Sequence, residues 1–274
     1  MKTSSPSCLW RLVFSEEKTS YLFGTIHLPV DSVVWNKRYV YECISESDHY
    51  FGEMDLDEMA KTGMKGGNVL PKGMAISDLF STIKSYNKVR NAIKKSFQVD
   101  IELFSHLKPL LFQHLLDIAI SGGEAGIMDQ ELLNYAKSCG KPIGGLETFK
   151  DQLNILNKID LDYQLKLLKE IASNTKAYHK RIKQLIKLYS QQDIRKLYLT
   201  SVKAAGRYRN LMIYERNGKM ADRIVKLDPG KYFISLGVGH LYGNKGLLAL
   251  LKREGVKMVP LSEKKTPPFI SNNN

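Results

Sequence analysis

Two apolar segments, one near each end of the chain, run directly into a glycine turn that carries a histidine. Near the start, Tyr21-Leu-Phe23 leads into Gly24-Thr-Ile-His27. Near the end, Lys231-Tyr-Phe-Ile-Ser-Leu236 leads into Gly237-Val-Gly-His240. Short apolar runs bounded by turn signals are typical of buried strands. If the two strands pair in parallel, both histidines lie beyond the strands' carboxyl ends, where open α/β sheets bind ligands. We therefore expect one shared site.

The remaining pattern predicts an α/β fold with a mixed sheet built from both ends of the chain and a large, mostly helical insertion. The insertion runs from about 60 to 226 and contains one short strand near 142–147. We expect a single domain over 1–261 and a flexible tail over 262–274. The expected strands are Cys8–Phe14, Ser20–Ile26, His49–Met54, Lys141–Glu147, Lys231–Leu236 and Val256–Leu261.

Helices are predicted from amphipathic periodicity and from start and stop signals. A glycine- and lysine-rich loop is expected near Thr62–Pro71, and Gly140 is a helix stop. The expected helices are Asn36–Glu46, one opening at Lys108-Pro109, Met128–Ser138, one from Thr148, one or two over Leu161–Tyr189, about Asp193–Ala204, about Arg207–Val225, and one opened by Leu241–Gly246.

Charge and composition limit the class of protein. Lysine and arginine outnumber aspartate and glutamate by 41 to 28, a net charge of +13. This basic balance suits an anionic membrane face or an acidic partner, but solvated helix faces are the preferred explanation. No basic motif with interleaved aromatic residues is present, so we expect no nucleic-acid partner. Three scattered cysteines predict neither a disulfide framework nor a thiolate metal site.

No apolar run in the sequence is long enough to span a membrane, and the first residues lack the apolar stretch of a signal peptide. The chain as given is therefore expected to be soluble and cytoplasmic, or secreted or envelope-associated if a leader has been removed. The oligomeric state cannot be read from these features.

His27, Glu53 and His240 together supply two imidazoles and a carboxylate at predicted strand ends. This set suits a divalent metal ion, manganese, cobalt or zinc, with open positions for water and substrate. Such an ion activates water, so metal-assisted hydrolysis is the expected reaction class. Asp55 is the closest rival ligand to Glu53, and an ordinary solvated acidic loop over Glu53–Glu58 is the alternative.

Other residues fit supporting roles. Glu147, at another strand end, suits a base that takes the proton of the water. Gly24, Gly237 and Gly239 allow the backbone to approach closely or to adopt unusual dihedral angles. Arg216, beside Asn217 in a helical segment, suits a substrate carboxylate or a developing oxyanion, with an ordinary helix surface as the alternative.

The remaining four histidines are not expected in the site. An apolar helix favours a core or surface position for His114, and the same holds for His106 next to it. His179 lies in a lysine-rich helix and looks solvated. His49 opens its strand, and we therefore expect it at the far end of the sheet.

Several segments in this order and spacing resemble the TraB/GumN family, which includes TIKI-type Wnt-cleaving proteases and PrgY-type pheromone-shutdown proteins. The resemblance runs nearly end to end. Its segments are Leu9-Trp-Arg-Leu12, Tyr21-Leu-Phe-Gly-Thr-Ile-His27, Gly52-Glu53-Met-Asp55, Met128-Asp-Gln130 with Leu132-Leu133, Gly140-Lys-Pro142, Leu146-Glu-Thr148 with Gln152, Glu215-Arg-Asn217, and Gly237-Val-Gly-His-Leu241 with Gly243 and Gly246.

The resemblance implies an α/β core with helical insertions and a metal-dependent hydrolase centre in which both Gly-x-x-His motifs are essential. Manganese- or cobalt-like ions support peptidase activity in the TIKI branch. On this chain the motifs fall on His27 and His240, with Glu53 at the matching acidic position. The TIKI branch is membrane-tethered, however, and this chain shows no anchor, so the resemblance does not carry the substrate over.

Three functions remain open. The first is a metal-dependent peptidase acting on a peptide or protein substrate. The second is a non-catalytic protein that sequesters a peptide or signalling ligand. The third is esterase or amidase chemistry on a small molecule, with a metal or with histidine and glutamate alone.

Overall fold

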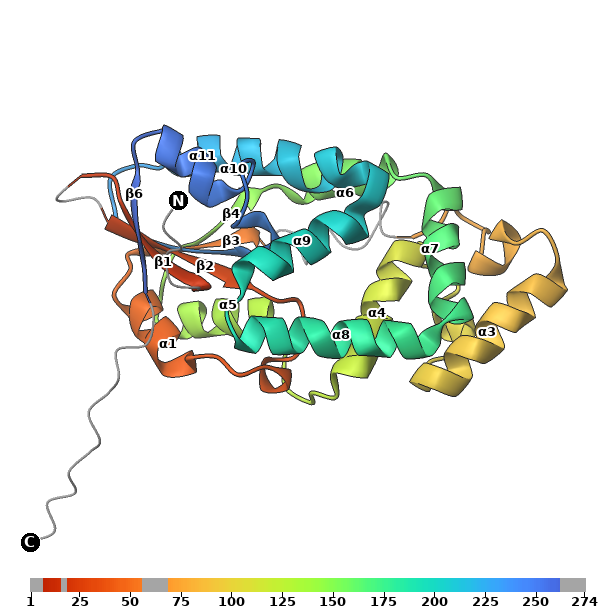
Figure 1. Cartoon of the computed structure of the whole chain (residues 1–274). Coiled ribbons are helices and arrows are strands. Elements are labelled where there is room, and N and C mark those ends of the chain that lie inside the picture. Colours follow the sequence, from red (N-terminus) through yellow and green to blue (C-terminus); the bar gives the residue numbers. More distant parts are fainter. Residues whose placement is uncertain (1–6, 16–18, 56–68, 262–274) are drawn as a thin grey trace, which may run out of the picture.

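The computed structural model describes residues 7–15, 19–55 and 69–261. Within these residues six strands form one sheet in the order β4-β3-β5-β2-β1-β6. The strands come from both ends of the chain apart from β4, as the sequence predicted (Figure 1). They are β1 (Leu9–Val13), β2 (Thr19–Thr25), β3 (His49–Met54), β4 (Ile143–Glu147), β5 (Tyr232–Gly237) and β6 (Lys257–Pro260).

Four neighbouring strands of this mixed sheet, β4, β3, β5 and β2, run parallel. The register sets Thr25 opposite Gly237 and Met54 opposite Glu147. On the other side of β2, β1 and β6 pair antiparallel. The carboxyl ends of the four parallel strands therefore meet at one edge of the sheet, which confirms the parallel pairing expected for the two histidine-bearing segments.

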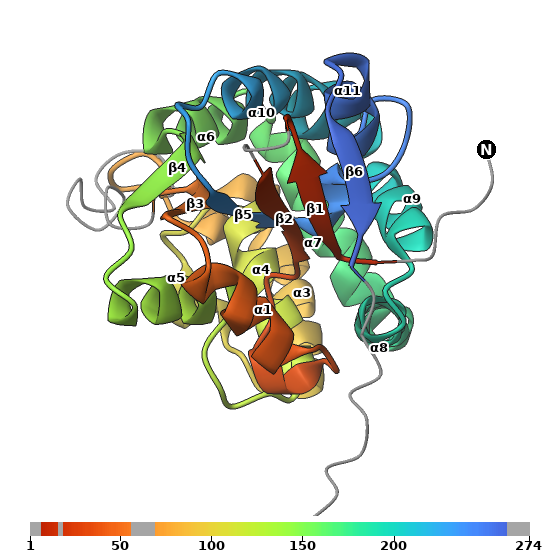
Figure 2. The same ribbon diagram turned by 90° about the vertical axis from the view of Figure 1, so that its left-hand side faces the viewer.

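The central strands β2 and β5 are almost entirely buried, every residue of β5 included. Their near-continuous apolar sequences match strands covered on both faces. Figure 2 shows the cover, with α6, α10 and α11 on one face of the sheet and α1 and α5 on the other. The α-helices of the described residues are α1 (Lys37–Ser45), α3 (Ile83–Phe97), α4 (Pro109–Ser121), α5 (Met128–Ser138), α6 (Phe149–Asn157), α7 (Leu161–Ser173), α8 (Thr175–Ser190), α9 (Ile194–Ala205), α10 (Glu215–Val225) and α11 (Leu247–Arg253).

Side-chain caps explain where several helices begin. The side chain of Asn36 accepts a hydrogen bond from Tyr39 N at the start of α1, and Thr148 and Asp151 form a capping box at the start of α6. Asn174 accepts one from Ala177 N and separates α7 from α8. The periodic stretch Leu161–Tyr189 is therefore two helices.

Two segments differ from the predicted helices. The segment expected as a helix over Arg207–Val225 begins with a 3-10 turn and a π-helical stretch, Asn210–Tyr214, before α10. After β5, Val238–His240 forms a 3-10 turn and α11 begins only at Leu247. Single π-helical turns are often found at functional sites.

The buried side chains form two clusters. One surrounds the sheet and includes Leu22, Phe233 and Leu251. The other lies among α3, α4, α7 and α8 and includes Ile93, Phe112 and Leu168. In Figure 1 these four helices extend away from the sheet on the side of its carboxyl edge. The insertion therefore forms its own packed layer beside the strand ends that carry the candidate site.

Some expectations concern residues outside the described ranges. These are the turn residues 16–18, residues 56–68 with the end of the acidic run and most of the expected loop, and the tail over 262–274. In the described residues, no helix combines the length and hydropathy needed to cross a membrane.

Candidate active site

His27, Glu53 and His240 converge on Gly237 at the carboxyl edge of the sheet. A Cβ atom at Gly237 would lie 3.3 Å from His27 Nε2, 3.4 Å from Glu53 Oε2 and 3.6 Å from His240 Cδ2. The φ angle of Gly237 is −54°, which other residues adopt readily. Glycine is therefore required here for space rather than for an unusual dihedral angle. Gly24 and Gly239 also serve close packing, since added Cβ atoms would meet Leu241 and Ser201.

His27 follows β2 and is held through one ring nitrogen. Its Nδ1 lies 2.8 Å from Oδ2 of Asp129, at the start of α5, and the hydroxyl of Thr25 donates to Oδ1 of the same carboxylate at 2.8 Å. The Asp129 carboxylate raises the pKa of His27 to about 9. The His27 side chain is 51% exposed, so Nε2 remains open toward the cavities described below.

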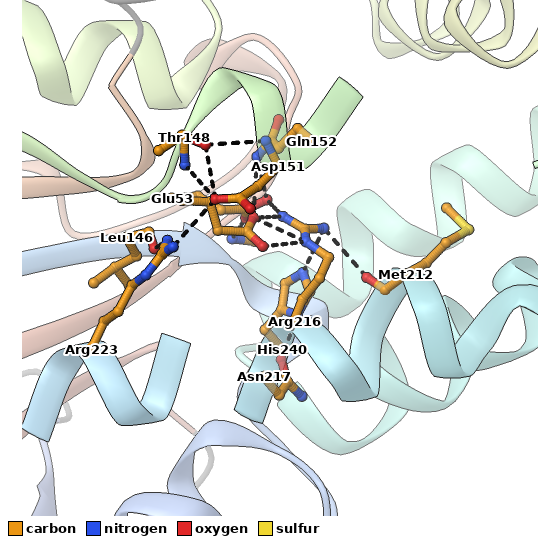
Figure 3. Close-up of polar contacts among 12 residues, drawn as sticks. Glu53, Leu146, Thr148, Asp151, Gln152, Met212, Arg216, Asn217, Arg223 and His240 are labelled. Atoms are coloured by element: carbon orange, nitrogen blue, oxygen red, sulfur yellow. Dashed lines mark hydrogen bonds and ion pairs between the residues drawn. The ribbon is translucent and has the colours of Figure 1, made fainter. Parts of the chain in front are cut away.

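His240 is held in the same way but is buried. Asn217 donates from Nδ2 to the carbonyl of Lys245, which leaves Asn217 Oδ1 to accept from His240 Nδ1 at 2.6 Å. Burial lowers the pKa of His240 to about 4. A neutral ring that donates from Nδ1 presents a lone pair at Nε2. That nitrogen lies 3.4 Å from an Arg216 guanidinium nitrogen (Figure 3).

The Arg216 guanidinium links two carboxylates, Glu53 at the end of β3 and Glu147 at the end of β4; Figure 3 shows it beside Glu53. Its Nε lies 3.1 and 3.0 Å from the two oxygens of Glu147, and one of its terminal nitrogens also pairs with Glu53. Burial raises the pKa of Glu53, but the positive charges around it, above all that of Arg216, outweigh burial and hold the pKa well below its usual range. Glu53 is therefore an ionised group at neutral pH. Its other oxygen accepts from the backbone nitrogen of Gly237 at 2.9 Å.

The donor chemistry suits a divalent cation. Metal-binding histidines usually donate their second ring nitrogen to a carboxylate or carbonyl oxygen, as His27 and His240 do here. Together with Glu53 they supply the two imidazoles and one carboxylate of many open metal sites. In the parts of the chain that the structure describes, however, no three His, Cys, Asp or Glu side chains form a ready-made metal cluster. The chemistry of His27, Glu53 and His240 fits a cation, and two of these residues, Glu53 and His240, also contact Arg216.

Two cavities, of about 590 and 530 Å³, open on either side of these residues. Both reach His27 and Arg216. We name them the α8 cavity, which is lined partly by α7, α8 and α9, and the α6 cavity, which is lined partly by α5, α6 and β4. Gly237 and His240 line the α8 cavity, and Glu53 lines the α6 cavity. The candidate groups are thus accessible from two directions.

The structure changes the expectation for two residues named from the sequence. The side chain of Glu147 is 1% exposed and bound by Arg216, a geometry that suits positioning Arg216 rather than acting as the base we expected. Asp55 follows β3 but is not among the residues that line either cavity. Among the other residues of the expected site, His27, Glu53 and His240 lie around Gly237. Arg216 contacts Glu53 and His240, and Asn217 holds His240.

Sequence reasoning missed three polar residues at the site. Asp129 holds His27, and the Gln152 amide lies 3.3 Å from Glu53 and 3.4 Å from Glu147. His114, expected to be a core or surface residue, lies with its ring centroid 6.3 Å from that of His27 and lines the α6 cavity. Burial lowers its pKa to about 4. The segment Met128-Asp-Gln130 was the available signal for Asp129.

The other three histidines lie elsewhere. His49 opens β3 and stacks on Tyr232 at 4.8 Å, at the amino edge of the parallel strands, as expected. His179 stacks on Phe97 at 4.9 Å, and its Nε2 lies 3.2 Å from the carbonyl oxygen of Ser96. His106 is exposed. None of these three lines either cavity.

Comparisons with known proteins point in one direction. Metalloprotease TIKI2 of Danio rerio is 24% identical over 311 residues, which cover 91% of this chain and 58% of the relative. Metalloprotease TIKI1 of Homo sapiens is 23% identical, with 92% of this chain and 61% of the relative covered. The chain thus spans less than two thirds of the length of these curated relatives. No solved structure gives a significant match.

The family comparison covers nearly the whole chain. The model of the TraB/PrgY/gumN family matches residues 8–260, a range that includes all six strands and every candidate residue of the site. The chain therefore belongs to the TraB/PrgY/gumN family.

Proposed function

We propose that this protein is a metal-dependent hydrolase that cleaves peptide or protein substrates. The observation that supports the proposal best is the convergence of His27 Nε2, Glu53 Oε2 and the His240 ring on Gly237. The curated relatives that bear the name metalloprotease agree with it. His27, Glu53 and His240 would hold the ion, with manganese, cobalt or zinc as candidates.

The chain's own residues supply the rest of the proposed mechanism. A divalent ion held by His27, Glu53 and His240 would lower the pKa of a water molecule and polarise a substrate carbonyl. Asp129 and Asn217 fix the two imidazoles so that each presents Nε2. Arg216 places its positive charge beside the oxyanion that develops on the carbonyl oxygen, while its N–H groups contact Glu53, Glu147, His240 and the carbonyl of Met212. Glu147 holds the guanidinium in place for that role.

A second candidate is metal-free hydrolysis with His27 as general base. The observation that favours it is the Asp129–His27 pair, because a carboxylate that orients an imidazole is the arrangement of many hydrolases without metals. In this mechanism the deprotonated ring of His27 takes the proton from water or from a nucleophile through Nε2, and Arg216 again stabilises the oxyanion. Because Asp129 raises the pKa of His27 to about 9, the base is formed only as the pH approaches 9, and the rate of metal-free hydrolysis should rise up to that pH. Ester or amide bonds of small molecules are then equally suitable substrates.

One experiment separates these candidates. The purified chain is incubated with a peptide library in manganese, cobalt or zinc, or in a chelator, and His27→Ala and His240→Ala are compared after circular dichroism confirms folding. Metal-dependent cleavage that both variants lose supports the metallopeptidase. Chelator-resistant cleavage that His27→Ala and Asp129→Asn lose supports the metal-free mechanism. Binding of peptides without turnover under every condition overturns both and favours a sequestering protein.

A further inference from the structure

The two cavities that meet at the candidate site have different walls. They share five lining residues: His27, Leu110, Ile159, Met212 and Arg216. His27 and Arg216 thus face both cavities. An extended substrate chain that passes His27 and Arg216 can occupy both cavities, whereas a site that binds the end of a substrate chain needs only one cavity.

The α6 cavity has an apolar interior. Its walls include Leu111 of α4, Leu133 of α5, Ile143 of β4 and Leu153 of α6. Leu133 is 2% exposed, while Leu111, Ile143 and Leu153 are partly exposed and thus present carbon atoms to the space. The aspartate, glutamate and arginine side chains that line this cavity are Glu53, Asp129 and Arg216, all of which belong to the candidate site.

The α8 cavity has charged groups away from the cluster. Asp117 of α4, Glu170 of α7 and Arg181 of α8 line it. Asp117 accepts a hydrogen bond from Tyr178 at 2.5 Å, and the Arg181 guanidinium lies 4.7 Å from the centroid of the Tyr178 ring. The charged groups on this wall can pair with polar side chains of a substrate. A polar substrate group that enters the α6 cavity without a partner would lose its hydration and gain no hydrogen bond.

We propose that the α6 cavity is the specificity pocket of the enzyme and binds an apolar side chain that flanks the cleaved bond, while the substrate chain continues into the α8 cavity. The inference rests on the proposed peptidase function. Full burial of a leucine-sized side chain contributes about 1.5–3 kcal/mol, a preference of roughly tenfold to a hundredfold over a small or charged residue. Leu111, Leu133, Ile143 and Leu153 are the residues that set this preference.

The test uses a peptide library randomised around one fixed position and read by mass spectrometry. The wild type is expected to cleave beside leucine, phenylalanine or methionine at least about tenfold faster than beside aspartate. Leu153→Glu adds a carboxylate to the α6 cavity and is expected to abolish that preference. The matched control is Leu167→Glu, because Leu167 is a partly exposed leucine on the wall of the α8 cavity. It should leave the apolar preference unchanged.

A second measurement tests binding in the α6 cavity independently of peptide cleavage. Peptides that carry photo-leucine are crosslinked to the wild type, and the modified residues are mapped. Crosslinks to α5, α6 or β4 that Leu153→Glu removes support the pocket even if no peptide is cleaved, an outcome that overturns only the peptidase. Cleavage without an apolar preference overturns only the pocket, and absence of both cleavage and crosslinks overturns both. Leu111→Glu, on the opposite wall, replaces Leu153→Glu if the latter does not fold.

Discussion

Arg216 binds Glu147 through its Nε, which lies 3.1 and 3.0 Å from the two carboxylate oxygens, and the side chain of Glu147 is 1% exposed. Glu147 ends β4 and Arg216 lies in α10, so this buried ion pair joins the edge of the sheet to a helix that covers it. The pair also fixes the guanidinium beside Glu53 and His240.

Removal of the Glu147 carboxylate is expected to destabilise the fold. In Glu147→Ala the buried guanidinium retains only Glu53 as an ionic partner among the contacts described, and breaking such a buried pair costs about 3–5 kcal/mol. Urea denaturation measures the change. Glu170→Ala is the control, because its 4.0 Å pair with Lys166 is exposed and should contribute less than about 1 kcal/mol. Equal effects of the two changes would contradict the structural role of Glu147.

Gly237→Ala is expected to impair the site without unfolding the protein. The added methyl carbon would lie 3.3 Å from His27 Nε2 and 3.4 Å from Glu53 Oε2, so both groups must shift. Small displacements of catalytic groups are costly, and we expect at least about tenfold lower kcat/KM. The assay is peptide cleavage, with circular dichroism as the check on folding.

Gly218→Ala is the matched control for that change. Gly218 lies in α10, and a Cβ atom there has no neighbour within 4 Å. Alanine in a helix interior is favoured over glycine by roughly 0.5–1 kcal/mol, so this variant should be slightly more stable and fully active. Full activity of Gly237→Ala, or loss of activity in Gly218→Ala, would speak against a space requirement specific to Gly237.

Asp129→Asn tests the partner of His27. The change removes the charge that orients Nδ1 at 2.8 Å and is expected to weaken binding of manganese or zinc by roughly 10- to 100-fold. Isothermal titration calorimetry measures the affinity. Thr25→Val removes only the hydroxyl that donates to Asp129 and should have a smaller effect. An unchanged affinity in Asp129→Asn would contradict the role of the Asp129 charge in supporting His27 as a ligand.

The fold could be predicted from the sequence where the periodicity of apolar residues and the order of the elements along the chain indicate the same structure. The apolar run of β5 and its glycine turn already indicated a parallel partner for β2, and the register Thr25 opposite Gly237 confirms it. Asn174 marks the break between α7 and α8, but a run of apolar positions three to four residues apart continues across it. The π-helical stretch Asn210–Tyr214 has no periodic signal in the sequence, and in the structure its Met212 carbonyl accepts a hydrogen bond from Arg216 at 3.3 Å.

The candidate site could be predicted only in part, because the sequence indicates which residues follow strands but not how the helices pack beside them. His27, Glu53 and His240 follow strands, so topology alone brings them to one edge. Asp129 and His114 belong to helices, and an aspartate in the first turn of a helix usually serves the helix dipole. Their proximity to His27 depends on how α4 and α5 pack against the sheet, which tertiary contacts decide.

Asp117 is expected to make stability depend on pH. Burial raises its pKa to about 6, above the value of about 3.9 in an unfolded chain. The protonated form is thus favoured in the fold, and its stabilising contribution, complete below about pH 3.9, is lost as pH rises through 6. Between pH 5 and 7.5 this amounts to about 1 kcal/mol.

The measurement is the free energy of unfolding of the wild type and Asp117→Asn across that range. The difference between them should shift by about 1 kcal/mol in favour of Asp117→Asn as the pH rises. Asp162→Asn, an exposed change on α7, is the control and should follow the wild type. Parallel profiles for wild type and Asp117→Asn would contradict the raised pKa.

The most direct test of the metal-dependent site is the metal content of the purified protein. Elemental analysis after loading with manganese, cobalt or zinc is compared between the wild type and a folded His27→Ala, His240→Ala double variant. We expect close to one ion per chain in the wild type and almost none in the double variant. Equal metal content in both proteins, or none in the wild type after loading, would contradict a metal centre at His27, Glu53 and His240.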